Sequence, residues 1–158
     1  MAAGHEHFMR LAMEEATRGG AEGNIAVGSV VARDGAVVAR GRNLVAVTGD
    51  PTAHAEVVAV REASRALGRR DLSGHALYTT WEPCPMCGGA ILASGIATLV
   101  LGARHDPTTS RWGAFTVERL LDLADRERRL QLVAGVLPGE CRRVREEWDT
   151  RNGLTRPR

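Results

Sequence analysis

The sequence has no lysine, so all 21 of its basic residues are arginine. A replacement this uniform indicates coding bias more than a binding function. The arginines face 19 acidic residues, which leaves a formal net charge of only +2 at pH 7. Residues 139–158 carry six arginines and four acidic residues, again a net +2. This balance does not support a nucleic-acid-binding tail.

Long apolar runs are also missing. No segment reaches the ~20 apolar residues that cross a bilayer, and no N-terminal stretch resembles the apolar part of a signal peptide. There are three cysteines, an odd number that does not support a disulfide framework. We therefore expect a soluble cytoplasmic protein that makes no contact with a membrane.

What is present fits one globular unit. With 158 residues, 44% of them hydrophobic, the chain can bury one substantial core, and we expect a single domain over residues 1–158. Gly19 and Gly20 are expected to end the first helix, and Asp34 and Gly35 to form a tight hairpin turn.

Apolar spacing predicts an alternation of helices and strands. The expected helices are residues 6–19, 53–67, 83–95, 116–129 and 139–152, and the expected strands are residues 25–33, 36–41, 75–80, 97–102 and 130–135. Strands that alternate with helices pair in parallel and carry helices on both faces. The sequence therefore predicts an α/β fold, a three-layer α/β/α sandwich with a five-stranded mixed sheet.

Two of the cysteines are spaced as in a metal site. Cys84 and Cys87 lie three residues apart at the start of an expected helix, which places both sulfur atoms on one face of its first turn. Pro83 and Pro85 suit a helix start, and a helix N-terminus favours the thiolates that a metal needs. Taken alone, the pair is also compatible with a redox-active C-x-x-C motif.

His54 and Glu56 lie at the start of the expected helix 53–67. Side chains two residues apart on a helix point about 200° apart, so both can serve one site only if the helix begins near them. Pro51 and Thr52 indicate such a beginning, which lets His54 turn toward a metal and Glu56 toward its bound water. Two thiolates and one imidazole suit Zn²⁺ and leave a fourth position for water, as in catalytic sites. Glu56 would then move protons as a general acid and base.

Together, H-A-E at residues 54–56 and P-C-P-M-C at residues 83–87 match the H-x-E and P-C-x-x-C signature of zinc nucleobase deaminases. With DPTAHAE, LYTTWEPCPMCGGAI and VGSVVARDG, the chain resembles the cytidine and deoxycytidylate deaminase superfamily over about residues 5–150. The resemblance is to the branch that holds bacterial guanine deaminases and tRNA adenosine deaminases. It implies hydrolytic deamination, a five-stranded mixed sheet flanked by helices, and a homodimer.

The resemblance also implies roles for single residues. It implies that the zinc ligands are His54, Cys84 and Cys87. Glu56 corresponds to the proton shuttle. Asn43 matches the asparagine that hydrogen-bonds substrate, the alternative being a residue that closes its own loop. The backbone carbonyl of Glu82 matches one that faces the leaving amine.

Aromatic residues are scarce, at 4% of the chain. Those near the motifs are candidates for stacking on a substrate ring. Trp81 precedes the cysteine motif, and Trp112 and Phe115 lie in or beside the expected loop 104–113. With so few aromatic residues, some of them must also supply the core.

Segments of the chain resemble both deaminase types. TGDPTAHAEVVAVREA and EPCPMC are similar to guanine deaminases, whereas GARHDPTTSRWGAF and VAGVLPGEC are similar to tRNA adenosine deaminases. The tRNA enzymes usually have small residues in place of Arg111, Trp112 and Phe115, and paired phenylalanines where this chain has Trp148. A bulky pocket suits a free base or nucleoside, because an RNA strand needs an open mouth and compensation for its phosphates. We expect a small purine such as guanine as substrate, with the tRNA wobble adenosine as the alternative.

A protein of another class would use the metal for structure alone. Such a site needs a fourth protein ligand, which would be Cys141, the remaining cysteine, or another residue. Glu56 argues against this alternative, because a structural site has no use for an acid. Cys141 is otherwise expected to be a small buried side chain.

Overall fold

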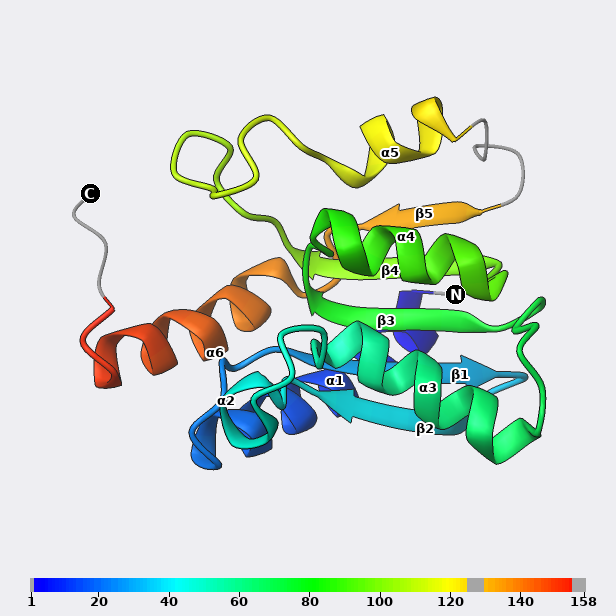
Figure 1. Cartoon of the computed structure of the whole chain (residues 1–158), viewed down its shortest axis with the longest axis horizontal. Coiled ribbons are helices and arrows are strands. Elements are labelled where there is room, and N and C mark those ends of the chain that lie inside the picture. Colours follow the sequence, from blue (N-terminus) through cyan, green and yellow to red (C-terminus); the bar gives the residue numbers. More distant parts are fainter. Residues whose placement is uncertain (1, 125–129, 155–158) are drawn as a thin grey trace.

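The computed structural model describes residues 2–124 and 130–154. Its elements, drawn in Figure 1, are α1 (Ala2–Ala21), β1 (Gly28–Arg33), β2 (Ala36–Arg42), α2 (Val45–Thr48), α3 (Ala55–Leu67), β3 (Ala76–Trp81), α4 (Pro85–Ser94), β4 (Thr98–Ala103), α5 (Val117–Leu123), β5 (Gln131–Ala134) and α6 (Pro138–Arg151). The expected helix 116–129 corresponds to α5, and its residues 125–129 lie outside the described residues. Within the described ranges, no helix is long and apolar enough to cross a membrane.

The five strands form one mixed sheet in the order β2-β1-β3-β4-β5. β1 is antiparallel to β2 and β3, whereas β3, β4 and β5 run parallel. α3 and α4 cover one face of the sheet, and α1 and α6 pack on the other (Figure 1). The predicted three-layer α/β/α fold with a five-stranded mixed sheet is confirmed.

Each face of the sheet has its own buried cluster. Leu77 packs with Ala59 of α3 and Ile91 of α4 on one face. The next residue along β3, Tyr78, packs with Met9 of α1 on the other face. This alternation is the two-residue period of a strand that is covered on both sides. The His and Cys motifs lie on the α3–α4 side, because these two helices carry them.

The predicted hairpin turn is confirmed. Asp34 and Gly35 join β1 to β2 with φ angles of 50° and 80°. Positive φ at both central residues gives the turn a twist that matches the flanking strands, and Gly35 adopts it without a steric cost.

The prediction that Gly19 and Gly20 end the first helix is wrong, because α1 runs to Ala21. Gly20 instead permits a close approach between helices. A Cβ atom at Gly20 would lie 2.9 Å from Cδ1 of Trp148 in α6. The glycine is needed for packing, and the chain leaves the helix through Gly23, which has a φ of 90°.

α3 packs directly on the backbone of β2 at Gly41. A Cβ atom at Gly41 would lie 2.3 Å from the carbonyl oxygen of Ala55 and 2.5 Å from the backbone nitrogen of Ala59. The first turn of α3 is therefore held against the sheet by a contact that only glycine allows. That turn carries Glu56 and follows His54 directly.

Candidate active site

Two helix N-termini meet at the candidate site. His54 is the N-cap residue of α3 and Cys84 is the N-cap residue of α4, and both have extended backbones with ψ of 155° and 171°. The predicted start of the helix beside His54 is thus confirmed. Because His54 precedes the helical spacing, its ring reaches the cysteines while Glu56 occupies the first turn of α3.

The structure brings His54, Cys84 and Cys87 together as a group that could hold a metal ion. The two sulfur atoms are 3.5 Å apart, and His54 Nδ1 lies 3.7 Å from Cys84 Sγ and 3.5 Å from Cys87 Sγ. A tetrahedral zinc requires separations of about 3.8 Å between sulfurs and about 3.6 Å between sulfur and nitrogen, given its usual bond lengths. The donor atoms therefore fit zinc in both type and spacing.

The two thiols share a proton. The hydrogen bond between Cys84 Sγ and Cys87 Sγ lowers the pKa of Cys84 to about 4 and raises the pKa of Cys87. The contact with Cys84 also raises the pKa of His54. A metal ion bound by both sulfurs would replace the shared proton, as thiolate ligation requires.

Glu56 is buried beside this group, with 4% of its surface exposed. Burial raises the pKa of its carboxyl group, and the neighbouring Cys84 sulfur raises it further. The hydroxyl of Thr79 in β3 donates to Glu56 Oε1 at 3.3 Å. A carboxyl group with a raised pKa beside a metal position is suited to take up a proton and return it.

Asn43 directly follows the last residue of β2. The residue after it, Leu44, is hydrogen-bonded to the segment that precedes α3. Leu44 donates its backbone N–H to the carbonyl oxygen of Ala53, which precedes His54. The side-chain oxygen of Asn43 accepts from the backbone nitrogen of Val45 at 3.1 Å, and the side chain is 4% exposed. This contact fixes the amide orientation and leaves the NH₂ group as its donor end.

Trp112 packs against a buried cluster formed by Val57 of α3 and the two cysteines, Cys84 and Cys87. The guanidinium carbon of Arg111 lies 4.5 Å from the centre of the Trp112 ring, a cation–π distance. Arg111 is also close enough to oppose the protonation of His54 electrostatically. The segment between β4 and α5 therefore places an aromatic ring and a cation beside the candidate metal ligands.

Phe115 belongs to the same segment but faces α4. Its ring lies 3.9 Å from where a Cβ atom of Gly88 would be, and its carbonyl oxygen is 3.1 Å from His105 Nε2. Phe115 is half-buried. Its contacts in the structure are with the helix that carries Cys87.

Trp81 lies with the cluster on the α1–α6 face of the sheet. Its ring is flanked by the guanidinium groups of Arg142 and Arg145, at 5.5 Å and 5.4 Å from its centre. These contacts are made with α6, and the structure does not bring Trp81 into the cluster of Trp112 and the cysteines.

Glu82 is buried between β3 and the cysteine motif. Its backbone nitrogen donates to the carbonyl oxygen of Ala103. Its carboxylate, for which the sequence predicted no role, binds Arg104 and the backbone nitrogen of Val117. The contacts reach 22 and 35 residues along the chain, so no local pattern could have revealed them.

Cys141 is separate from the ligand group. It is 1% exposed and packs with Phe8 and Met9 on the α1–α6 face. Burial raises the pKa of its thiol to about 12, which opposes formation of a thiolate. Within the described residues, the metal-binding group contains only His54 and the other two cysteines. The alternative in which Cys141 supplies a fourth ligand therefore fails on position.

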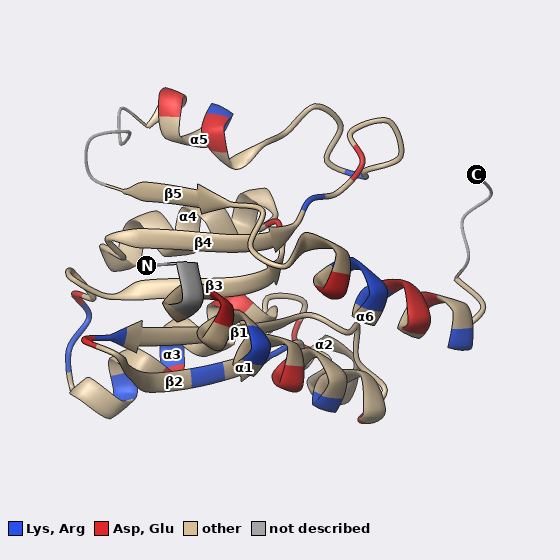
Figure 2. Ribbon diagram, turned by 180° about the vertical axis from the view of Figure 1, so that it is seen from behind, with Lys and Arg blue, Asp and Glu red and all other residues tan. Residues whose placement is uncertain are grey.

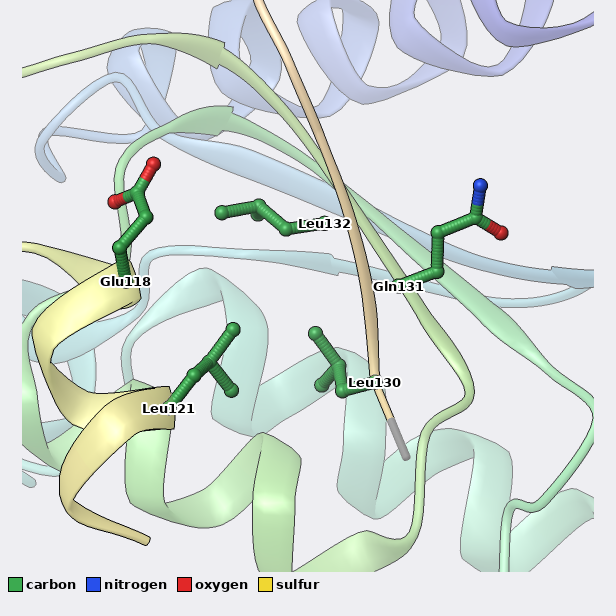
Figure 3. Close-up of a pocket in the computed structure, with 5 residues that line it drawn as sticks. All are labelled: Glu118, Leu121, Leu130, Gln131 and Leu132. Carbon is green, nitrogen blue, oxygen red and sulfur yellow. The ribbon is translucent and has the colours of Figure 1, made fainter. Parts of the chain in front are cut away.

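A cavity of about 250 Å³ lies elsewhere, between α5 and β5 (Figure 3). It is lined by Glu118, Leu121, Leu130, Gln131 and Leu132. The metal-binding group contributes none of these residues, so the cavity is not the predicted substrate site.

Comparisons with known proteins match this geometry. The family model described as the cytidine and deoxycytidylate deaminase zinc-binding region matches residues 3–103. The tRNA-specific adenosine deaminase of Bacillus subtilis is 37% identical over 139 residues, which are 86% of this chain and 83% of the relative. A solved guanine deaminase from Nitrosomonas europaea aligns with a TM-score of 0.80 and 26% identity, over 92% of this chain and 84% of that chain.

One relative is much longer than this chain and matches it over only a small part of its own length. The chloroplastic tRNA(adenine(34)) deaminase of Arabidopsis thaliana is 49% identical over 98 residues, which are 62% of this chain. The matched region is 8% of that relative's length.

Proposed function

The chain belongs to the cytidine and deoxycytidylate deaminase family, and from that premise we propose that it is a zinc-dependent hydrolase that deaminates a small purine base or nucleoside such as guanine. The products are ammonia and the corresponding oxo compound. The proposed zinc ligands are His54, Cys84 and Cys87, whose donor atoms have tetrahedral spacing.

Zinc bound by these residues supplies a Lewis acid that makes a water molecule acidic enough to attack near neutral pH. Glu56 accepts the proton of the attacking water and delivers it to the ring nitrogen beside the reacting carbon. It then takes the remaining proton from the hydroxyl group added to the ring carbon and passes it to the amino group. The carbon–nitrogen bond breaks, the oxo group forms, and ammonia leaves. The raised pKa of the buried Glu56 carboxyl supports this double role.

Asn43 holds the substrate ring in this proposal. Its side-chain oxygen is already engaged by Val45, so its NH₂ group donates to an acceptor atom on the ring. The backbone carbonyl of Glu82, directly before the cysteine motif, accepts from the leaving amine.

One observation supports a small substrate above all. Trp112 packs on the cluster of Val57, Cys84 and Cys87, with Arg111 stacked on its ring. An aromatic side chain beside the candidate ligands offers a flat surface on which a planar base can stack. Stacking of a base on an aromatic ring contributes about 1–3 kcal/mol.

A second candidate is deamination of adenosine at the tRNA wobble position. It is favoured by the Bacillus subtilis tRNA-specific adenosine deaminase, which matches 86% of this chain at 37% identity. In that case Trp112 would stack on a base extruded from an RNA loop.

The test is ammonia release by the purified protein from a panel of amino-substituted purines, pyrimidines and triazines, as bases and as nucleosides. We expect turnover of guanine or a related purine by protein that holds one zinc per chain. Trp112→Ala should raise KM or lower kcat for that substrate. If no member of the panel releases ammonia, the small-substrate proposal is wrong.

The homodimer implied by the family resemblance is part of the proposal and is tested by light scattering.

A further inference from the structure

The carboxylate of Glu82 is the centre of a buried polar network. Its side chain is 2% exposed. Oε1 accepts from Arg104 Nη1 at 2.8 Å and from the backbone nitrogen of Val117 at 3.3 Å. Oε2 faces Nδ1 of His105 at 3.6 Å. One carboxylate thus contacts residues on both sides of the segment between β4 and α5.

The partners of Glu82 are themselves connected across that segment. Arg104 also binds Glu118 in α5, with Nη1–Oε2 at 3.1 Å and Nη2–Oε1 at 2.5 Å. Nε2 of His105 lies 3.1 Å from the carbonyl oxygen of Phe115. The start and the end of residues 104–118, which lead from the end of β4 to α5 in Figure 1, are therefore tied together at Glu82.

Between the two ends lie Arg111 and Trp112, the residues beside the candidate metal ligands. Glu82 is two residues before Cys84 in the chain. The same residue therefore adjoins the metal-binding turn and holds both ends of the segment that covers it. A buried carboxylate is stabilised only while its partners are in place, so the network favours one position of the segment.

We propose that Glu82 acts through its carboxylate as a positioning residue that holds residues 104–118 over the site and so places Trp112 for substrate binding. The role in substrate binding rests on the proposed function. The role in holding the segment does not, because it follows from the contacts of Glu82 alone.

The test compares Glu82→Gln with Glu140→Gln. Glu140 is a matched control, because it makes a similar bond of 2.7 Å to Arg10, but on the exposed side of α6. The first measurement is the rate at which trypsin cleaves after Arg111 in the native full chain, followed by mass spectrometry. We expect at least about tenfold faster cleavage in Glu82→Gln and no change in the control, since cleavage tracks the population of the open segment.

The second measurement is kinetic and uses zinc-loaded protein. We expect Glu82→Gln to raise KM by about tenfold, with kcat within about twofold, because it removes a charged hydrogen bond that acts on binding. Zinc content should stay at one per chain. Unchanged KM and kcat would contradict positioning of Trp112. If Glu82→Gln loses zinc while trypsin cleavage after Arg111 stays as slow as in the wild type, Glu82 stabilises the turn that carries Cys84 and Cys87 instead. That result also overturns the proposal.

A second variant, Arg104→Gln, is used in case Glu82→Gln does not fold. It removes the ion pair between Arg104 and Glu82 by changing Arg104, the more exposed of the two residues. If trypsin cleaves folded Arg104→Gln after Arg111 no faster than it cleaves the wild type, Glu82 does not hold the segment. If the wild-type protein turns over no substrate, the proposed function fails, while the proteolysis comparison still decides the role of Glu82.

Discussion

Glu56 lies two residues after His54, yet both side chains lie at the candidate site. They can do so because α3 begins between them, at Ala55. The imidazole extends from an N-cap residue toward the sulfur atoms. The carboxyl group extends from the first helical turn into a buried position beside Thr79. A helix that began one turn earlier would point the two side chains apart.

Replacing Glu56 by Gln should lower kcat by at least about 10²- to 10⁴-fold, the contribution typical of a general acid or base. The amide keeps the size of the side chain but cannot shuttle a proton. Zinc content, measured by mass spectrometry of the metal, should remain one per chain. Glu62→Gln is the control, because Glu62 lies on the same helix, half exposed and paired with Arg65. Near-normal turnover of Glu56→Gln would remove Glu56 from the mechanism.

Replacing Cys141 by Ser should leave zinc content and turnover unchanged. Cys141 packs on the α1–α6 face, and burial raises its pKa to about 12, so it offers no thiolate to the metal. Cys87→Ser provides the contrast and should lose zinc, which a metal assay on the purified variants will report. Loss of zinc from Cys141→Ser would instead support a closed, structural site.

At this scale the sequence predicted the residues whose roles depend on near neighbours. His54 and Glu56 share one short motif, as do Cys84 and Cys87, and the structure brings the three candidate ligands together. The carboxylate of Glu82 could not be predicted in the same way, because its partners are distant in the chain and its burial depends on the folded sheet.

Among the elements, α3 depends most on a single backbone contact. A methyl group at Gly41 would lie within 2.5 Å of backbone atoms in α3, so helix and strand would have to separate. We predict that Gly41→Ala lowers the free energy of unfolding by about 1–3 kcal/mol. It should also lower turnover, because α3 carries Glu56.

The matched control is Gly89→Ala in α4, where no heavy atom lies within 4 Å of the added methyl group. It should raise the free energy of unfolding by up to about 1 kcal/mol, since alanine favours a helix over glycine. Urea unfolding of both variants measures the difference. Equal stability of Gly41→Ala and wild type would show that α3 can shift without cost.

The elements that the sequence predicted are those with a local pattern. The alternation of apolar residues and the Asp34–Gly35 turn predicted the strands and the hairpin. α2 has no such pattern. A distant residue stabilises it instead, because Asn24 Oδ1 accepts hydrogen bonds from the backbone nitrogens of Ala46 and Val47. The late end of α1 was missed for a similar reason, since Gly20 accommodates Trp148 from the far end of the chain.

For the whole molecule, the distribution of charge bears on the size of the substrate. α6 contains four arginines and four acidic residues, so the helix has no net charge, and both signs are spread along it (Figure 2). Several of the arginines elsewhere are paired with carboxylates, as Arg42 is with Glu22 and Arg104 with Glu118. Paired arginines have less capacity to replace counterions along an RNA strand.

The dependence of activity on salt therefore separates the two candidate substrates. A neutral base makes no phosphate contacts, so we predict that kcat/KM for guanine or a related purine changes by no more than about twofold between 50 and 200 mM salt. An anticodon stem-loop with adenosine at the wobble position should remain largely unedited under the same conditions, as measured by inosine formation. If tRNA is the substrate instead, the stem-loop should be edited and no free base or nucleoside should release ammonia. Six to ten phosphate contacts would then make binding about 10³- to 10⁵-fold weaker over that range of salt.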